Sequence, residues 1–164
     1  KCDTVVLSVG LIPEMQMANF VRLSKSTSGA VVNEFYQTDK DWLFSCGNIL
    51  HVHDLVDNVA LEAKQAGKFA SLYAQNKLPD KAKPIEVAST SDFSYVLPST
   101  IYEGAGQVEI KFRLRNKIVK KTICAKCNDV ILGKRFILAG VPGEMMSLTF
   151  DKSGAHDKIQ LEIN

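Results

Sequence analysis

The sequence predicts an α/β segment followed by an antiparallel, sandwich-like all-β domain. An apolar run over residues 4–10 ends in glycine, which is typical of a strand buried on both faces. Residues 57–76 have small side chains three and four apart, which predicts a helix. Beyond the proline-containing stretch 78–84, apolar and polar residues alternate, which predicts strands. We therefore place a boundary in that stretch and divide the chain into domains 1–83 and 84–164.

The composition predicts a globular protein. In 164 residues, 46% are hydrophobic and 23% are charged, which is enough apolar material for a packed core and disfavours disorder. The net charge is only +2, so we expect no nucleic-acid partner. No apolar run approaches the roughly 18 residues that a membrane span needs, so we also expect no membrane contact and a cytoplasmic location.

The first region is expected to contain further short strands and one helix. Residues 30–32 and 42–46 are β-type runs bounded by polar or glycine-containing stretches. Asp54 or Asp57 is expected to cap the helix, and Glu62 is expected to point away from its buried face. That buried face is predicted to consist of the small residues Ala60, Ala63, Gly67, Ala70 and Ala74.

The second region has the pattern of a β-sandwich or small barrel. Strands are expected over residues 108–114, 146–150 and 159–163, each with one wet face. Turn-forming residues separate the apolar runs at the spacing typical of hairpins. These turns are at residues 116–117, 128–129, 141–143 and 151–154.

Gly47 and Asn48 are the first candidates for ligand binding. They follow a predicted buried strand, and the helix begins within about ten residues. Glycine lets a ligand approach the backbone closely, and an asparagine amide both donates and accepts hydrogen bonds. Unpaired amides at a helix N-terminus favour negative charge. The sequence therefore predicts a site for an anionic or polar ligand at this turn.

Residues 38–47 resemble the second flavin-binding motif of the FAD-dependent pyridine nucleotide-disulfide oxidoreductases, in which a threonine, a spacer and an apolar strand end in Gly-Asp or Gly-Asn. Residues 8–14 are similar to that family's return from the NAD-binding to the FAD-binding domain, and residues 29–33 resemble the hairpin strand between them. Residues 46–54 resemble the branch described as NAD(FAD)-dependent dehydrogenases. The matches occur in family order and cover roughly residues 1–76.

The resemblance implies that domain 1–83 is the C-terminal part of an FAD-binding, Rossmann-like domain. Asn48 would stand where the family's aspartate reaches the ribityl and pyrophosphate part of FAD, and Gly47 would allow that approach. Backbone amides near Val56 and Asp57 would face the pyrimidine edge of the flavin. NAD(P)H would be the electron donor.

Neither of the family's two Gly-x-Gly-x-x-Gly motifs is present. Gly104-Ala105-Gly106 lacks the third glycine and precedes a predicted strand, so we interpret it as a turn. We therefore expect N-terminal segments outside this chain to complete the FAD and NAD sites. The full-length protein would be an oxidoreductase, whereas this chain alone would be inactive. A second subunit or a companion redox protein is the partner that the family implies. The alternative hypothesis is a non-enzymatic, β-rich interaction or assembly module.

His51 and His53 are candidate catalytic residues. They lie two apart between Gly47-Asn48 and the helix, which would place imidazoles beside the flavin edge, where a general acid or base is useful. The alternative is a pair of loop histidines that hydrogen-bond to the backbone. We predict no metal site, because His-x-His with one carboxylate lacks a diagnostic third ligand.

Cys124 and Cys127 form a Cys-x-x-Cys pair, which is the spacing of a redox pair or of half a zinc site. The following Asn128-Asp129 and an apolar run predict a hairpin instead of the helix N-terminus that a thioredoxin-like pair needs. We favour inert hairpin cysteines over redox or metal use.

Overall fold

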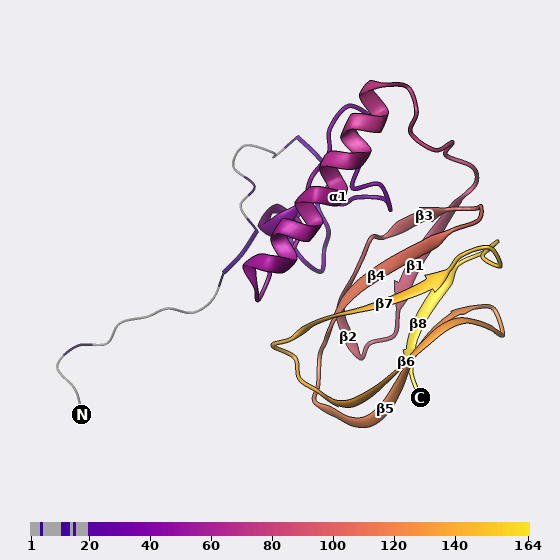
Figure 1. Ribbon diagram of the computed structural model, residues 1–164. Helices are drawn as coiled ribbons and strands as arrows, with labels where there is room; N and C mark the ends of the chain where they lie inside the picture. The colour runs from indigo at the N-terminus through magenta and orange to yellow at the C-terminus, as the bar shows by residue number, and fades with distance from the viewer. Residues whose placement is uncertain (1–3, 5–10, 14, 16–19) are drawn as a thin grey trace.

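The computed structural model describes residues 4, 11–13, 15 and 20–164, and it contains one long helix and two β-sheets (Figure 1). Apart from residue 4, the predicted strand at residues 4–10 lies outside the described residues, and so does most of the similarity at residues 8–14.

The described chain begins with irregular structure and a single helix, and ends in eight strands. A 3-10 turn, η1 (Gly47–Ile49), precedes helix α1 (Val56–Ala74). The strands are β1 (Pro84–Ser89), β2 (Phe93–Leu97), β3 (Thr100–Tyr102), β4 (Gln107–Leu114), β5 (Ile118–Cys127), β6 (Val130–Gly140), β7 (Met145–Asp151) and β8 (Ile159–Ile163). No helix of the described residues is long and apolar enough to cross a membrane.

The strands form two mostly antiparallel sheets with a common apolar core, and we call these two sheets together the sandwich. The five-stranded sheet has the order β3-β1-β8-β5-β6, and the three-stranded sheet has the order β2-β4-β7. Every pairing is antiparallel except β1 with β8. The alternating residues of β4 and β8 turn their apolar side chains inward, and Ile110, Phe112 and Leu161 are fully buried. The predicted period of two is therefore confirmed for this region.

The predicted turns are also confirmed. Residues 116–117, 128–129 and 141–143 separate consecutive strands, and Asn128 has a φ of 53° in its two-residue turn. Gly104 and Gly106, with φ of 138° and 122°, lie in the turn between β3 and β4.

The two short strands predicted in the first region are present only as isolated bridges. Leu23 bridges Ala30 and Gln37 bridges Phe44, both antiparallel. Asn33, directly after the first segment, forms a parallel bridge to Thr100 of β3, but none of these bridges extends into a longer ladder. A Rossmann-like arrangement of this region therefore stays a prediction.

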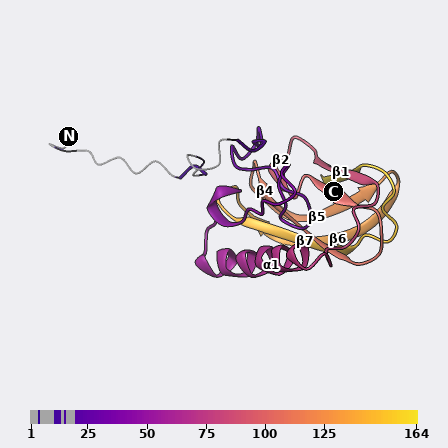
Figure 2. The same ribbon diagram turned by 90° about the horizontal axis from the view of Figure 1, so that it is seen from above.

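Helix α1 is confirmed within two residues at each end, but the prediction of its buried face is wrong. Glu62 and Ala66 are the buried helix residues, whereas the predicted small-residue face, Ala70 apart, is exposed. The reason is tertiary: α1 lies on the β7 side of the sandwich (Figure 2), where Lys111 of β4 pairs with Glu62. The prediction that Asp54 or Asp57 caps the helix is also wrong, because the N-cap is Leu55 and no side chain caps the helix. Asp57 lies within the first turn, and Asp54 bonds to Arg113.

Candidate functional site

The Gly47 turn packs against the first turns of α1. Gly47 has a φ of +74°, a left-handed conformation that glycine adopts without strain. Its N–H donates to Glu62 Oε2 over 3.3 Å, and a Cβ at this position would lie 3.4 Å from Val59 Cγ1. The glycine thus lets the backbone turn tightly beside the helix.

Asn48, the next residue, is exposed and holds the loop that leads into α1. Its Oδ1 accepts a hydrogen bond from the backbone N–H of His53 at 3.1 Å, and His53 Nδ1 lies 3.3 Å from the same oxygen. Because a backbone N–H is only a donor, the atom facing it is the Asn48 oxygen.

The start of α1 is open. The N-cap residue Leu55 provides no side-chain hydrogen bond to the first-turn amides. Leu55 and Val56 are 63% and 79% exposed, and Asp57 is also exposed. Of the four residues predicted to contact FAD, Asn48, Val56 and Asp57 are therefore exposed, whereas Gly47 is buried.

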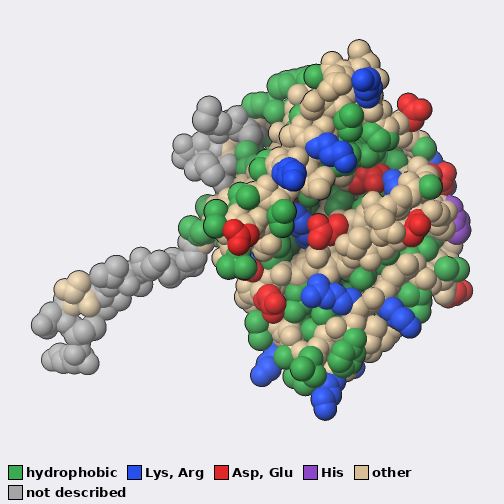
Figure 3. Space-filling view, in the orientation of Figure 1, with side chains coloured by type: hydrophobic (Ala, Val, Ile, Leu, Met, Phe, Trp, Pro, Cys, Tyr) green, Lys and Arg blue, Asp and Glu red, His purple; other side chains and the backbone are tan. Residues whose placement is uncertain are grey.

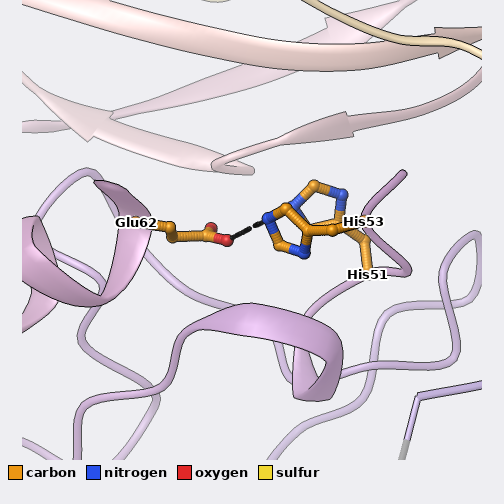
Figure 4. A group of neighbouring side chains, drawn as sticks. All are labelled: His51, His53 and Glu62. Carbon is orange, nitrogen blue, oxygen red and sulfur yellow. Dashed lines mark ion pairs between the residues drawn. The ribbon is translucent and has the colours of Figure 1, made fainter. Parts of the chain in front are cut away.

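His51 and His53 are brought together with a third residue, Glu62 of α1. Figure 4 shows both imidazoles, which project from the loop after η1, beside the Glu62 carboxylate. His53 Nε2 lies 2.6 Å and His51 Nε2 3.6 Å from Glu62 Oε2. All three side chains are at most 1% exposed. We call His51, His53 and Glu62 the His-His-Glu cluster.

The other ring nitrogens of the cluster contact neighbouring groups. His51 Nδ1 lies 2.8 Å from the Tyr95 hydroxyl on β2, and His53 Nδ1 faces Asn48. In contrast, the Nε2 atoms of both histidines have no partner in hydrogen-bond geometry, and neither has Glu62 Oε1. The short contact between His53 Nε2 and Glu62 Oε2 is thus not aligned as a hydrogen bond.

Lys111 of β4 is the cation nearest to the cluster, with Nζ 3.4 Å from Glu62 Oε1. Burial raises the pKa of the Glu62 carboxyl, but the adjacent imidazoles and the Lys111 ammonium outweigh it and hold that pKa well below its usual range. Burial is the main reason that the pKa of His51 is lowered. At neutral pH, Glu62 is therefore ionised and His51 is neutral.

A second polar contact joins the same loop to the sandwich. Asp54 Oδ1 accepts from Arg113 Nη2 at 2.7 Å, and Asp54 Oδ2 accepts from the Met145 N–H at 2.7 Å. Arg113 also donates to the Val52 carbonyl at 3.0 Å. The loop containing both histidines is thereby tied to β4 and to the start of β7.

Two clefts adjoin the boundary between α1 and the sandwich. One, of about 410 Å³, is lined by Glu62, Asn58, Lys111 and Arg135 among others. The other, of about 500 Å³, lies between residues 32–36, α1 and the sandwich. Figure 3 shows acidic and basic side chains interspersed over this face of the molecule. The four residues predicted to contact FAD line neither cleft.

The sequence analysis missed Glu62, Lys111 and Tyr95. Glu62 sits among alanines whose spacing suggested a different buried face, and Lys111 occupies a strand face expected to be wet. Tyr95 lies on a strand that the alternation pattern did not single out. The available signal was the His-x-His pair next to a helix that carries one glutamate in its second turn.

Cys124 and Cys127 are free and buried in β5. Cys127 Sγ lies 3.9 Å from His156 Nδ1, and Cys124 Sγ accepts from Asn164 at 3.5 Å. Within the part of the chain that the structure describes, the His-His-Glu cluster is the one group with three converging metal-ligand atoms. Hairpin cysteines match this placement, because β5 and β6 are joined by the Asn128-Asp129 turn.

Comparisons with protein-family models, curated proteins and solved structures found no match to this chain.

Proposed function

We propose that this chain is the C-terminal part of an FAD-dependent NAD(P)H oxidoreductase, with residues 1–83 supplying half of the FAD pocket and residues 84–164 forming a β-rich accessory domain. The observation that carries the proposal is the uncapped, exposed start of α1, which follows the exposed Asn48 by eight residues. Free first-turn amides and an accessible asparagine are the donors that an anionic, polar cofactor needs. Residues 38–47 provide the matching sequence motif.

The residues present match one half of an FAD site. The Asn48 amide would bind the ribityl and pyrophosphate part, and the amides at Val56 and Asp57 would favour negative charge at the pyrimidine edge. When bound, FAD supplies two-electron transfer from NAD(P)H to an acceptor. His51 and His53 stay candidate proton donors and acceptors at this edge, although both imidazoles are turned inward to Glu62.

The exposed face of α1 is a further argument for a missing neighbour. Apart from its chain neighbours and the nearby backbone of α1 itself, no heavy atom of the described residues lies within 4 Å of a Cβ built on Gly67. Ala60 and Ala63 of the same helix are also exposed. A helix face of small residues lets another backbone approach closely. In the proposal, this face is covered by the N-terminal segments that carry the two glycine-rich motifs.

Flavin binding tests the proposal directly. We expect the full-length protein to purify yellow and to quench FAD fluorescence, and the 164-residue chain to bind FAD weakly. In the full-length protein, Asn48→Asp should retain FAD, because aspartate keeps the oxygen that holds His53. Asn48→Leu should lose it. A colourless full-length protein that binds no added FAD would overturn the proposal. Tight FAD binding by the 164-residue chain would show that no further segment is needed to complete the FAD pocket.

A specific observation also supports the alternative of a β-rich interaction module. Phe136 and Leu138, which point to the same side of β6, are 62% and 65% exposed, and Val119 on β5 is 54% exposed. β6 is an edge strand of the five-stranded sheet, where unpaired backbone groups favour association. Size-exclusion chromatography of Phe136→Ser against the unmodified chain tests it. An unchanged elution volume at high concentration would contradict self-association through β6.

A further inference from the structure

We propose that His51, His53 and Glu62 bind a divalent first-row transition metal such as Zn²⁺, which would replace the proton-transfer role that the flavin proposal leaves to the two histidines. The three ligand atoms lie within 4.8 Å of one another and come from a loop and from α1. Two imidazoles and one carboxylate, with a fourth position left to solvent or a ligand, form a common donor set for this class of metal.

The tautomer of His53 directs its Nε2 atom toward a shared cation. Its backbone N–H already donates to Asn48 Oδ1, so that oxygen is an acceptor and the neighbouring His53 Nδ1 must carry a proton to bond with it. Nε2 then faces Glu62 Oε2 over 2.6 Å. A nitrogen and a carboxylate oxygen come this close only with a cation between them, which is either a proton on Nε2 or a metal ion.

The directions in which the two Nε2 atoms face Glu62 Oε2 favour a metal ion over a shared proton. Neither histidine Nε2 has a partner in hydrogen-bond geometry, although His51 and His53 lie 3.6 and 2.6 Å from Glu62 Oε2. A proton shared by two atoms lies on the line between them, so their lone pairs point at each other. Two ligands of one metal point their lone pairs at the metal, and therefore not at each other. Tetrahedral coordination at ordinary Zn–N and Zn–O lengths puts the ligand atoms about 3.4 Å apart. The His51 contact already has this spacing, and the His53 contact reaches it by a side-chain shift of under about 1 Å.

The groups that contact the second ring nitrogen of each histidine are also those expected around a metal site. Metal-bound imidazoles usually have the second ring nitrogen held by a hydrogen bond, which fixes the ring orientation. His51 has Tyr95 in this role, and His53 has Asn48. The Gly47 N–H donates to Glu62 Oε2 and helps to orient that oxygen toward the histidines.

Access and charge complete the site. Glu62 lines the cleft of about 410 Å³, whereas His51 and His53 do not, so a metal would enter from the carboxylate side. Lys111 contacts Glu62 Oε1, the oxygen on the side away from the histidine contacts, and also donates to the Tyr36 hydroxyl at 3.3 Å. Its positive charge opposes a bound dication, so Lys111 is expected to weaken binding.

Titration with Co²⁺ and Zn²⁺ tests the site in the 164-residue chain. We expect one saturable site, the visible absorption of four-coordinate Co²⁺, and displacement of Co²⁺ by Zn²⁺. His53→Ala and Glu62→Gln should each lower affinity at least about a hundredfold, and Tyr95→Phe about tenfold. His156→Ala, at the exposed third histidine of the chain, is the matched control and should bind as the unmodified chain does.

Two further measurements keep the test decisive if Glu62→Gln unfolds. Lys111→Met should raise affinity about tenfold, because it removes a like charge and leaves the three ligands in place. Histidine ¹⁵N shifts with saturating Zn²⁺ should show metal-bound Nε2 on His51 and His53. An unmodified chain without saturable binding, binding that survives His53→Ala, or a His53 that stays an imidazolium in excess Zn²⁺ would each overturn the proposal.

Discussion

The sandwich and the segment before it have different interiors. Seventeen buried apolar residues form one core in the sandwich, among them Phe112 and Leu161. The apolar cluster of residues 20–50 has four buried members and is joined by Leu97 of β2. Where this segment and α1 meet the sandwich, the buried side chains include His51, Glu62 and Lys111. The sandwich is therefore stabilised mainly by non-directional burial, and the preceding segment by specific polar contacts.

The difference matters for function because polar interiors are sensitive to what binds them. An apolar core keeps its stability over a wide pH range and does not depend on ions. A buried cluster of two imidazoles, a carboxylate and an ammonium changes with protonation or with metal. Four experiments in buffer containing a metal chelator separate the two kinds of interior.

The largest effect is expected in the sandwich core. Phe112→Ala should lower the free energy of unfolding by about 3–5 kcal/mol, because it leaves a cavity at a fully buried ring. Phe93, whose ring lies edge-on at 5.4 Å, would lose its contact as well. Urea unfolding measures the change. Val119→Ala, at an exposed position of the same sandwich, is the control and should stay within about 0.5 kcal/mol. Equal costs at both positions would contradict the assigned core.

The next effect is expected in the polar interior. Glu62→Gln should cost about 3 kcal/mol without metal, because Lys111 is left buried without its carboxylate. Hydrogen exchange should show faster exchange of α1 amides than of β5 amides. Glu144→Gln, in the exposed turn before β7, should change stability by less than about 0.5 kcal/mol. A stabilised Glu62→Gln variant would mean that the carboxylate is not paired in solution.

A smaller, pH-dependent effect is expected at Asp54. Burial raises the pKa of its carboxyl, but the Met145 N–H and the Arg113 guanidinium outweigh burial and lower it below the ordinary value. Because the folded pKa is lower than the unfolded one, the stabilisation is complete above the unfolded pKa and disappears as pH falls through the folded one.

Asp54→Asn should therefore lower stability by at most about 1 kcal/mol at neutral pH. The difference between the two proteins should shrink as the pH falls and disappear once the pH lies below the folded pKa of Asp54. Urea unfolding across this range measures the difference. Asp129→Asn, in the exposed β5–β6 turn, serves as control. A difference between Asp54→Asn and the unmodified chain that persists in acid would exclude the ion pair as its source.

The smallest effect distinguishes two glycines. Gly67→Ala should stabilise the chain by about 0.5–1 kcal/mol, since alanine favours the helix and nothing described lies within 4 Å of the new methyl group. Gly47→Ala should destabilise, because its φ of +74° is strained for alanine. Thermal unfolding measures both. A destabilised Gly67→Ala chain would show that the small-residue face of α1 is covered in solution.

The β-rich region was predictable because its information is local. In β4 and β8, apolar and polar residues alternate, and the buried side of each strand follows from that alternation. Turn residues such as Asn128-Asp129 mark where strands end, since few residues tolerate the required backbone angles. The existence of α1 followed equally from its helical spacing.

The polar site was predictable only in part. The positions of His51 and His53 ahead of a helix were visible in the sequence, and their interest as a pair was recognised. Glu62 was assigned to the wrong face, because a stripe of alanines and glycine is the more apolar side of α1. Its burial depends on the ion pair with Lys111, 49 positions along the chain, and no residue pattern near Glu62 predicts that ion pair.

The sequence by itself determined where strands, turns and the helix form, because those choices depend on side chains within a few residues of one another. It also determined that a glycine, an asparagine and two histidines precede a helix. Only the tertiary structure decided which side of α1 is buried and which residues surround the histidines. The reason is that charged residues far apart in the sequence pair with each other away from water. The free energy of such a buried pair depends on all the groups that surround it.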